Sequence, residues 1–305
     1  MSGFTITAGV SFSGGFTMTE APETNNTAAW FGGGLPGPVS TVQRITFATD
    51  TATASIRGPL SSARHYLAAA GNTTDGWFGG AYPNFSTVQR ITYATDTATA
   101  SIRGPLSSAR YVLAAAGNTT DAWFGGGAPG PMSTVDRITY ATDTATASIR
   151  GPLSLARRYL AAAGNTADAW FGGGGPGPGS TVDRITYATD TATASVRGPL
   201  SAGRSYLAAA GNTTDGWFGG GNGSSRVDRI TYATDTATAS VRGPLSVARQ
   251  GLAAAGNSDY GWFGGGFPPN STVDRITYAT DTATASVRGP LSSARYALAA
   301  AGGIQ

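Results

Sequence analysis

Arginine dominates the residues of this chain that could bind a ligand through charge. Six arginines recur at nearly regular intervals, each three residues before a leucine that opens an alanine-rich segment: Arg64, Arg110, Arg157, Arg204, Arg249 and Arg295. Guanidinium groups bind carboxylates and phosphates well, so six of them around one axis would form an anion site. Alternatively, each arginine pairs with a repeated aspartate or with backbone carbonyls between neighbouring repeats. The sequence leaves both interpretations open.

The residue types that enzymes and metal sites need are scarce. There is no cysteine, which excludes disulfides, zinc-thiolate sites and cysteine nucleophiles, and the one histidine, His65, occurs in a single repeat. The aspartate of each Ala-Thr-Asp-Thr segment lacks the neighbouring acids of a calcium site, so we expect it to bond its own turn backbone. The Gly-Gly-Gly runs precede Pro-containing segments rather than helices, unlike a phosphate loop. We therefore predict no enzymatic activity, no cofactor and no metal.

The candidate residues belong to a unit that the chain contains six times. The segment Arg-Ile-Thr-Tyr-Ala-Thr-Asp-Thr-Ala-Thr-Ala-Ser recurs with little change, and the tryptophans at 30, 77, 123, 170, 217 and 262 are spaced by 45 to 47 residues. Self-similarity at this period indicates a solenoid, a propeller or an array. The 45 glycines and 16 prolines fall at fixed points of a period that also carries aromatic and β-branched residues, so the chain is expected to fold.

Each repeat reads as four short strands. In one copy these are residues 206–211, 217–220, 227–232 and 236–242. Four strands per repeat without a helical segment are typical of a propeller blade. The first Trp-Phe-Gly strand (30–34) has no alanine strand before it, and the last alanine strand (298–301) has nothing after it. We predict an all-β, six-bladed β-propeller of four-stranded antiparallel blades over residues 30–305, closed by the C-terminal strand joining the N-terminal blade, because this pairs both open edges.

The repeat resembles the kelch repeat. The resemblance is carried by Ala-Arg-x-x-Leu-Ala-Ala-Ala-Gly, Trp-Phe-Gly-Gly and Val-Asp-Arg-Ile-Thr-Tyr, in that order, in all six copies. It departs from kelch at the tryptophan, which here opens the second strand instead of following the tyrosine by six or seven residues. The resemblance implies an inner first strand, an outer fourth strand and a binding role rather than catalysis.

Two segments of the repeat vary between copies, and both are expected at the same face of the disc. The segments after Gly-Gly are 35–38, 82–85, 129–132, 176–178, 222–226 and 267–270, and the segments before the inner strands are 65–66, 111–112, 158–159, 205–206, 250–251 and 296–297. Loops on a rigid scaffold are where binding residues concentrate. Besides the six arginines, the candidate ligand-binding residues are His65, Tyr82, Asn84, Phe85, Tyr111, Arg158, Arg226, Phe267 and Asn270. Such aromatic and polar side chains suit a glycan or protein ligand, although loops also vary where nothing constrains them.

Residues 1–29 stand outside the repeat. Apolar residues alternate with small polar ones there, which is typical of a half-buried strand. We expect this arm either to pack on the repeat body or mediate oligomerisation, or to be a flexible leader before the domain. It resembles, loosely, segments of phage and other virion appendage proteins, and it lacks the pattern of a secretory signal.

Charge and hydropathy limit the classes of partner. The net charge of +3 is spread over the repeats rather than clustered, which argues against nucleic acid, and no apolar run is long enough for a membrane span. The location is left open between virion and cytoplasm. The leading hypothesis is a non-enzymatic binding or structural module that recognises a glycan or protein through the variable loops. The alternative is a recently amplified or engineered repeat scaffold without a selected ligand.

Overall fold

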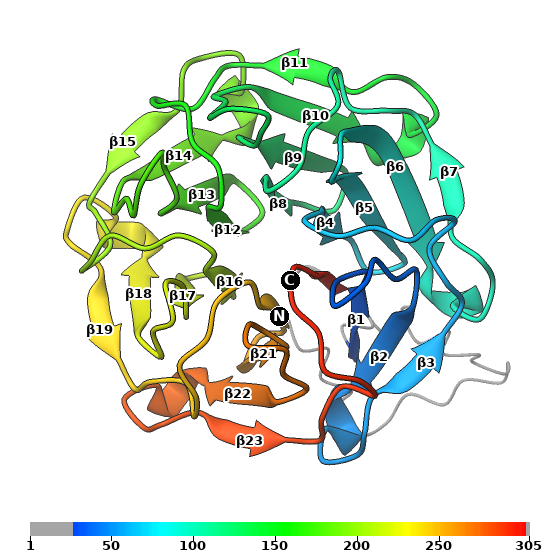
Figure 1. The fold of residues 1–305 in the computed structure, drawn as a ribbon. Coiled ribbons are helices and arrows are strands. Elements are labelled where there is room, and N and C mark those ends of the chain that lie inside the picture. Colours follow the sequence, from blue (N-terminus) through cyan, green and yellow to red (C-terminus); the bar gives the residue numbers. More distant parts are fainter. Residues whose placement is uncertain (1–26, 303–305) are drawn as a thin grey trace, which may run out of the picture.

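Six four-stranded antiparallel sheets are arranged in a ring in the computed structural model, which describes residues 27–302 (Figure 1). This confirms the predicted six-bladed propeller. The predicted arm lies outside the described residues up to residue 26, and the first strand begins at Ala28, two residues before the expected boundary. Blades 1 to 6 are numbered here by their outer strands in chain order.

Every blade uses the same four strands. The inner strands, in blade order, are β24 (Ala299–Gly302), β4 (Ala68–Gly71), β8 (Ala114–Gly117), β12 (Ala161–Gly164), β16 (Ala208–Gly211) and β20 (Ala253–Gly256). The second strands are β1 (Ala28–Gly32), β5 (Asp75–Ala81), β9 (Asp121–Gly125), β13 (Asp168–Gly172), β17 (Asp215–Gly219) and β21 (Tyr260–Gly264). The third strands are β2 (Val42–Thr46), β6 (Phe85–Thr92), β10 (Val135–Thr139), β14 (Val182–Thr186), β18 (Val227–Thr231) and β22 (Val273–Thr277). The outer strands are β3 (Ser55–Arg57), β7 (Ser101–Arg103), β11 (Ser148–Arg150), β15 (Ser195–Arg197), β19 (Ser240–Arg242) and β23 (Ser286–Arg288).

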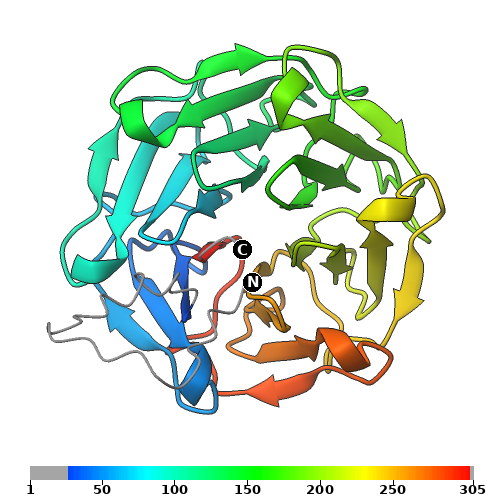
Figure 2. The same ribbon diagram turned by 180° about the vertical axis from the view of Figure 1, so that it is seen from behind.

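The outer strands are shorter than the sequence predicts, since only Ser240–Arg242 of the predicted 236–242 is a strand. One-turn 3-10 helices occupy the preceding tyrosine segments: η1 (Phe47–Thr49), η2 (Tyr93–Thr95), η3 (Tyr140–Thr142), η4 (Tyr187–Thr189), η5 (Tyr232–Thr234) and η6 (Tyr278–Thr280). The chain between η5 and β19 contacts blade 4, where the Ala239 N–H donates to the Pro199 carbonyl at 2.9 Å. A Cβ on Gly198 would lie 1.9 Å from the Ala237 carbonyl oxygen, so this close approach requires glycine. The 3-10 helices are drawn in front in Figure 2.

The ring closes as predicted, through the two ends of the chain. Strand β24 pairs with β1, with Trp30 opposite Ala301 and Gly32 opposite Ala299, so blade 1 has the strand order β24-β1-β2-β3. Without β24, the inner edge of β1 would be unpaired and open to association with other chains.

The hydrophobic core lies between the blades, as six similar clusters. In one of them, Trp170 and Val182 of blade 4 face Phe218, Ile230 and Tyr232 of blade 5. The Trp170 and Tyr232 rings stack with centroids 3.7 Å apart. Stacked and buried aromatic pairs of this kind stabilise each blade-to-blade seam.

A buried carboxylate joins each pair of blades. The Asp235 carboxylate of blade 5 accepts hydrogen bonds from Trp170 Nε1 at 2.8 Å and from an Arg184 Nη at 3.1 Å, both in blade 4. Arg197 Nε lies 3.4 Å from the same oxygen. The same contact joins Trp262 of blade 6 to Asp50 of blade 1 at 2.9 Å. The expectation that these carboxylates bond their own turn was therefore wrong, because their partners belong to the preceding blade.

Candidate functional site

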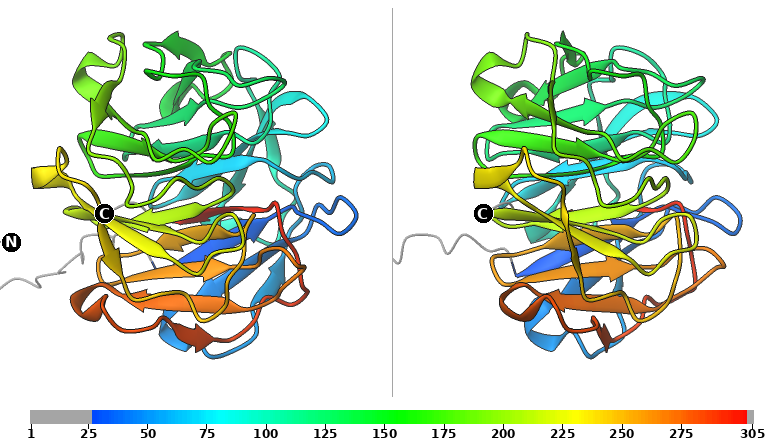
Figure 3. Two further views of the ribbon diagram at one scale, coloured as in Figure 1. Left: turned by 60° about the vertical axis from the view of Figure 1, so that its left-hand side comes forward. Right: turned by 90° about the vertical axis from the view of Figure 1, so that its left-hand side faces the viewer.

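The two sets of variable segments lie on one face of the propeller, as predicted. Antiparallel bridges pair them directly, for example His65 with Tyr82 and Gln250 with Phe267. We call this surface the variable face; it comprises the loops between second and third strands and the segments that lead to the inner strands. Figure 1 looks onto it, and Figure 3 shows it in profile, on the side opposite the 3-10 helices.

A closed ring of backbone hydrogen bonds surrounds the channel mouth on this face. Its members, one per blade, are the residues before the inner-strand leucines: Tyr66, Val112, Tyr159, Tyr206, Gly251 and Ala297. Each amide N–H donates to the carbonyl of the member in the preceding blade, at 2.7 to 2.9 Å. All six have left-handed backbone, with φ between 51° and 65°. We call these residues the mouth ring; because they make the same backbone contacts, their side chains are the feature that varies around the axis.

The six candidate arginines lie inside the blades rather than around the channel mouth. Their exposed fractions are 4% or less. One Nη of Arg157 donates to the Gly173 and Thr181 carbonyls at 2.7 and 2.8 Å, and the other contacts Asp183 at 2.7 Å. Burial lowers the Arg157 pKa, which Asp183 opposes. The candidate arginines of blades 3 to 6 each contact an aspartate in this way. This agrees with the expectation that each arginine pairs with a repeated aspartate, and the six arginines form no cationic ring around the channel.

Blades 1 and 2 lack this aspartate. Gln89 replaces it beside Arg64, and its side-chain oxygen accepts the Ser61 N–H. The Arg64 guanidinium donates to the Thr87 carbonyl and to Ser62 Oγ at 3.2 and 3.0 Å, and burial lowers its pKa to about 10. Gln43 takes the same place in blade 1. These two blades therefore bury a cation without a carboxylate partner among the described contacts.

Three tyrosines of the mouth ring come together although their blades are not all adjacent. Tyr159 and Tyr206 stack with ring centroids 3.8 Å apart, and Tyr66 from blade 2 meets Tyr159 edge-on at 6.4 Å. Burial, together with a hydrogen bond to Tyr159, raises the Tyr206 pKa. Burial also raises the Tyr66 pKa. The Tyr66 and Tyr206 phenols therefore stay neutral and can donate and accept hydrogen bonds at physiological pH.

A pocket opens beside these tyrosines, where the mouth ring has its smallest residue. The pocket has a volume of about 220 Å³, and we call it the aromatic pocket; its lining is Tyr66, Tyr206, Gln250, Gly251, Phe267 and Tyr296. Phe267 and Tyr296 meet edge-on with centroids 5.1 Å apart. None of the lining side chains is charged. The arrangement offers aromatic surface together with phenol and amide groups for an uncharged polar ligand.

The remaining predicted residues are divided between a second aromatic group and the loops. The rings of His65, Tyr82 and Tyr111 form a row, with Tyr82 5.1 Å from His65 and 5.2 Å from Tyr111. The other predicted residues lie apart from this row. The Phe85 ring lies 5.2 Å from the Arg64 guanidinium, and the Arg158 guanidinium lies 5.3 Å from the Tyr159 ring. Arg226 donates to Ser201 Oγ, the Asn270 side chain accepts the Thr272 N–H, and Asn84 is exposed.

Of the predicted residues, only Phe267 lines the aromatic pocket. Tyr66, Tyr206, Gln250 and Tyr296 were missed as individual candidates, although they lie within the variable segments. The signal that could have found them is the pair of residues before each inner-strand leucine, which differs between the copies while the leucine and the alanines after it are constant.

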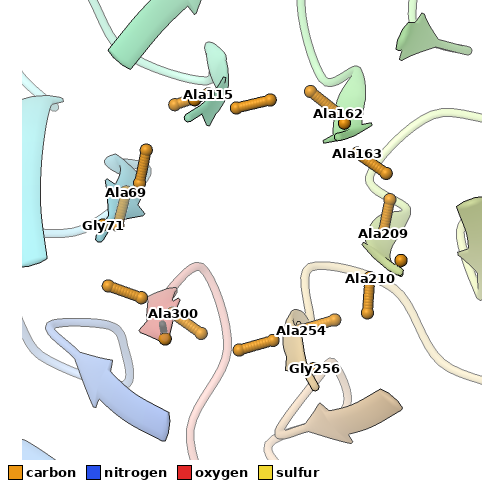
Figure 4. Close-up of a pocket in the computed structure, with 18 of the residues that line it drawn as sticks. Ala69, Gly71, Ala115, Ala162, Ala163, Ala209, Ala210, Ala254, Gly256 and Ala300 are labelled. Atoms are coloured by element: carbon orange, nitrogen blue, oxygen red, sulfur yellow. The ribbon is translucent and has the colours of Figure 1, made fainter. Parts of the chain in front are cut away.

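The channel below the mouth ring is lined by small side chains. Alanines and glycines of the inner strands enclose a space of about 120 Å³ (Figure 4). Asn165 and Asn212 are the polar side chains in this lining. Among residues 27–302, no group of three or more His, Cys, Asp or Glu side chains is placed to hold a metal ion. Within the same residues, no helix has the length and apolar character to cross a membrane.

Comparison with known protein families gives no match to this chain, and no curated protein matches it. The kelch-like pattern is therefore supported by the residues of the repeat alone, while the six-bladed fold is established by the strand pairing.

Proposed function

We propose that this protein is a non-enzymatic binding module that recognises a glycan through its variable face. The observation that carries the proposal is the aromatic pocket, which combines tyrosine and phenylalanine rings with an amide and no charge. A sugar has an apolar face of C–H groups and a rim of hydroxyls, so it matches a surface that offers both kinds of contact.

The scaffold beneath the face supports a binding role. Stacked Trp–Tyr or Trp–Phe rings lie in all six seams between blades. The hydrogen bonds of the mouth ring fix the backbone of each segment that leads to an inner strand. Side chains on such a backbone lose little conformational freedom when a ligand binds, which favours affinity. The kelch-like order of the repeat agrees with binding rather than catalysis, and a place on a virion is compatible with the proposal.

A glycan array tests the proposal, followed by calorimetry on any hit. We expect binding by the full chain, and loss of at least tenfold in affinity for an alanine variant at one or more of Tyr82, Phe85 and Phe267. Ile149→Ala on the outer rim, where the side chain is 66% exposed, is the matched control and should bind as the parent does. Absence of binding to every glycan would contradict the proposal.

The alternative is a repeat scaffold without a selected ligand. It is favoured by the near identity of the repeats outside the variable segments, and by the seam contacts that recur from blade to blade. This alternative predicts indifference to both glycan and protein ligands, with stability unchanged by alanine substitution of the exposed aromatic residues.

A further inference from the structure

We propose that Gly251 makes the aromatic pocket a single-sugar site, so that each propeller binds one uncharged pyranose unit at the channel mouth beside blade 6. The inference rests on the proposed glycan-binding function and assigns it a location, a stoichiometry and a residue that determines specificity.

The position of the pocket follows from the order of side chains in the mouth ring. Tyr159 and Tyr206 of blades 4 and 5 stack, and Tyr66 of blade 2 meets Tyr159. Blades 6 and 1 carry Gly251 and Ala297, so no large side chain fills the space between Tyr206 and Tyr66 on that side. The pocket occurs once because these two small residues are neighbours once.

The fold does not require glycine at position 251. A Cβ there would have its closest contact at 3.5 Å, which is ordinary packing. Its φ of 65° lies close to the values of 61° and 63° that Tyr159 and Tyr206 adopt in the same mouth ring. Left-handed backbone disfavours a side chain in general, but here the hydrogen-bonded ring already holds five non-glycine residues in it. The consequence of glycine is therefore the open pocket.

The lining selects a small and uncharged ligand. Tyr66, Tyr206 and Tyr296 provide three hydroxyls and Gln250 provides an amide, while Phe267 adds a purely apolar ring. A volume of about 220 Å³ is below the several hundred Å³ of pockets for larger ligands, which favours one ring of a glycan over a longer segment. A proline-rich peptide would use the aromatic rings but leave much of this polar set without partners, so a sugar fits better.

Titration calorimetry of the full chain with the methyl glycosides of glucose, galactose, mannose and N-acetylglucosamine tests the inference, with sialic acid as the charged counterpart. We expect one of the neutral glycosides to bind with a stoichiometry of one and sialic acid not to bind. Gly251→Tyr should fill the pocket and weaken binding at least thirtyfold while the melting temperature stays close to that of the parent. Gly251→Ala should have a smaller effect, and Ile149→Ala, on the outer rim away from the variable face, should bind within twofold of the parent.

The outcomes separate this inference from the proposed function. If no glycan or glycoside binds at all, both fail. If a glycan binds but Gly251→Tyr does not weaken it, or the stoichiometry exceeds one, or only longer glycans or a proline-rich peptide bind, the single-sugar site is wrong and the variable face can still be a binding surface. Should Gly251→Tyr fail to fold, Gln250→Leu and Tyr296→Ala replace it, and unchanged affinity in both would overturn the assignment.

Discussion

At the scale of single residues, one buried carboxylate per seam joins neighbouring blades. The Asp235 carboxylate accepts hydrogen bonds from Trp170 and Arg184 of the preceding blade, and the Arg197 guanidinium lies close to the same oxygen. Removing the charge while keeping the shape leaves two arginines without their shared anion and weakens the bond to the indole.

We predict that Asp235→Asn lowers the free energy of unfolding by about 2 kcal/mol, less than a fully buried pair would lose because the arginines are partly exposed. Since 1 kcal/mol corresponds to roughly 2 °C in a chain of this size, the melting temperature should fall by about 4 °C. Asp259→Asn at an exposed turn is the matched control, with no expected change. Equal melting temperatures for the two variants in a thermal scan would contradict the role of the seam carboxylate.

His65 should make stability depend on pH. Burial lowers its pKa in the folded protein below the usual 6.5, and its Nδ1 has no hydrogen-bond partner. The unfolded chain therefore binds a proton first as the pH falls, so the folded state should lose stability below about pH 6.5 and show no contribution from His65 above it. Denaturant unfolding from pH 5 to 8 measures this, and His65→Gln should flatten the slope between pH 5 and 6.5. A slope that is the same in both proteins would show that other groups cause it.

The sequence shows these residues without showing their partners. The six aspartates and six tryptophans are evident from the repeat, yet Trp170 and Asp235 are 65 residues apart and meet only because the next blade folds against the previous one. The local sequence of the turn indicates only a bond between the carboxylate and its own backbone. The sequence likewise shows that the six arginines precede the inner strands, but it does not show whether their side chains turn toward the channel or into the blades.

At the scale of the blade, the four strand types and their order could be predicted, while the strand lengths could not. The alternating Thr-Ala segment reads as part of the outer strand, but the bond from Ala239 to the neighbouring blade replaces strand pairing there. The sequence also shows whether the third strand of a blade carries Asp or Gln. Only the structure shows that this residue lies beside the buried arginine and decides whether the arginine has a carboxylate partner.

Restoring the missing carboxylate in blade 2 should stabilise the protein. Gln89→Asp would place an acid beside Arg64 as Asp183 stands beside Arg157, and hydrogen bonds to charged groups contribute about 1.5 kcal/mol or more. We expect the melting temperature to rise by a few degrees, about 2 °C for each kcal/mol. The reverse change, Asp183→Gln, should lower it. A destabilised Gln89→Asp protein would indicate that the Ser61 contact of the glutamine matters more than the charge.

At the scale of the whole molecule, the number of strands of each type predicts how the ring closes, but it does not predict the aromatic pocket. The unpaired first and last strands predict the pairing of β24 with β1. The pocket instead depends on which side chains of blades 2, 5, 6 and 1 face one another across the axis. That arrangement brings together residues from four successive blades of the closed ring, so the sequence of a single repeat does not reveal it.

Because the seams repeat the same contacts, shorter pieces of the chain should rebuild the ring from several copies. A fragment of residues 27–164 contains three repeats and ends with β12, as the whole chain ends with β24, so its last strand can pair with β1 of a second copy. Three blades are too few for a propeller ring, which typically has four to eight. We expect a dimer for this fragment and a trimer for residues 27–117, six blades in each case, by light scattering after size-exclusion chromatography. A fragment of residues 27–156 lacks the closing strand and should not form the closed dimer. A folded monomer of residues 27–164, or an open-ended series of sizes, would show that the seams do not specify six blades.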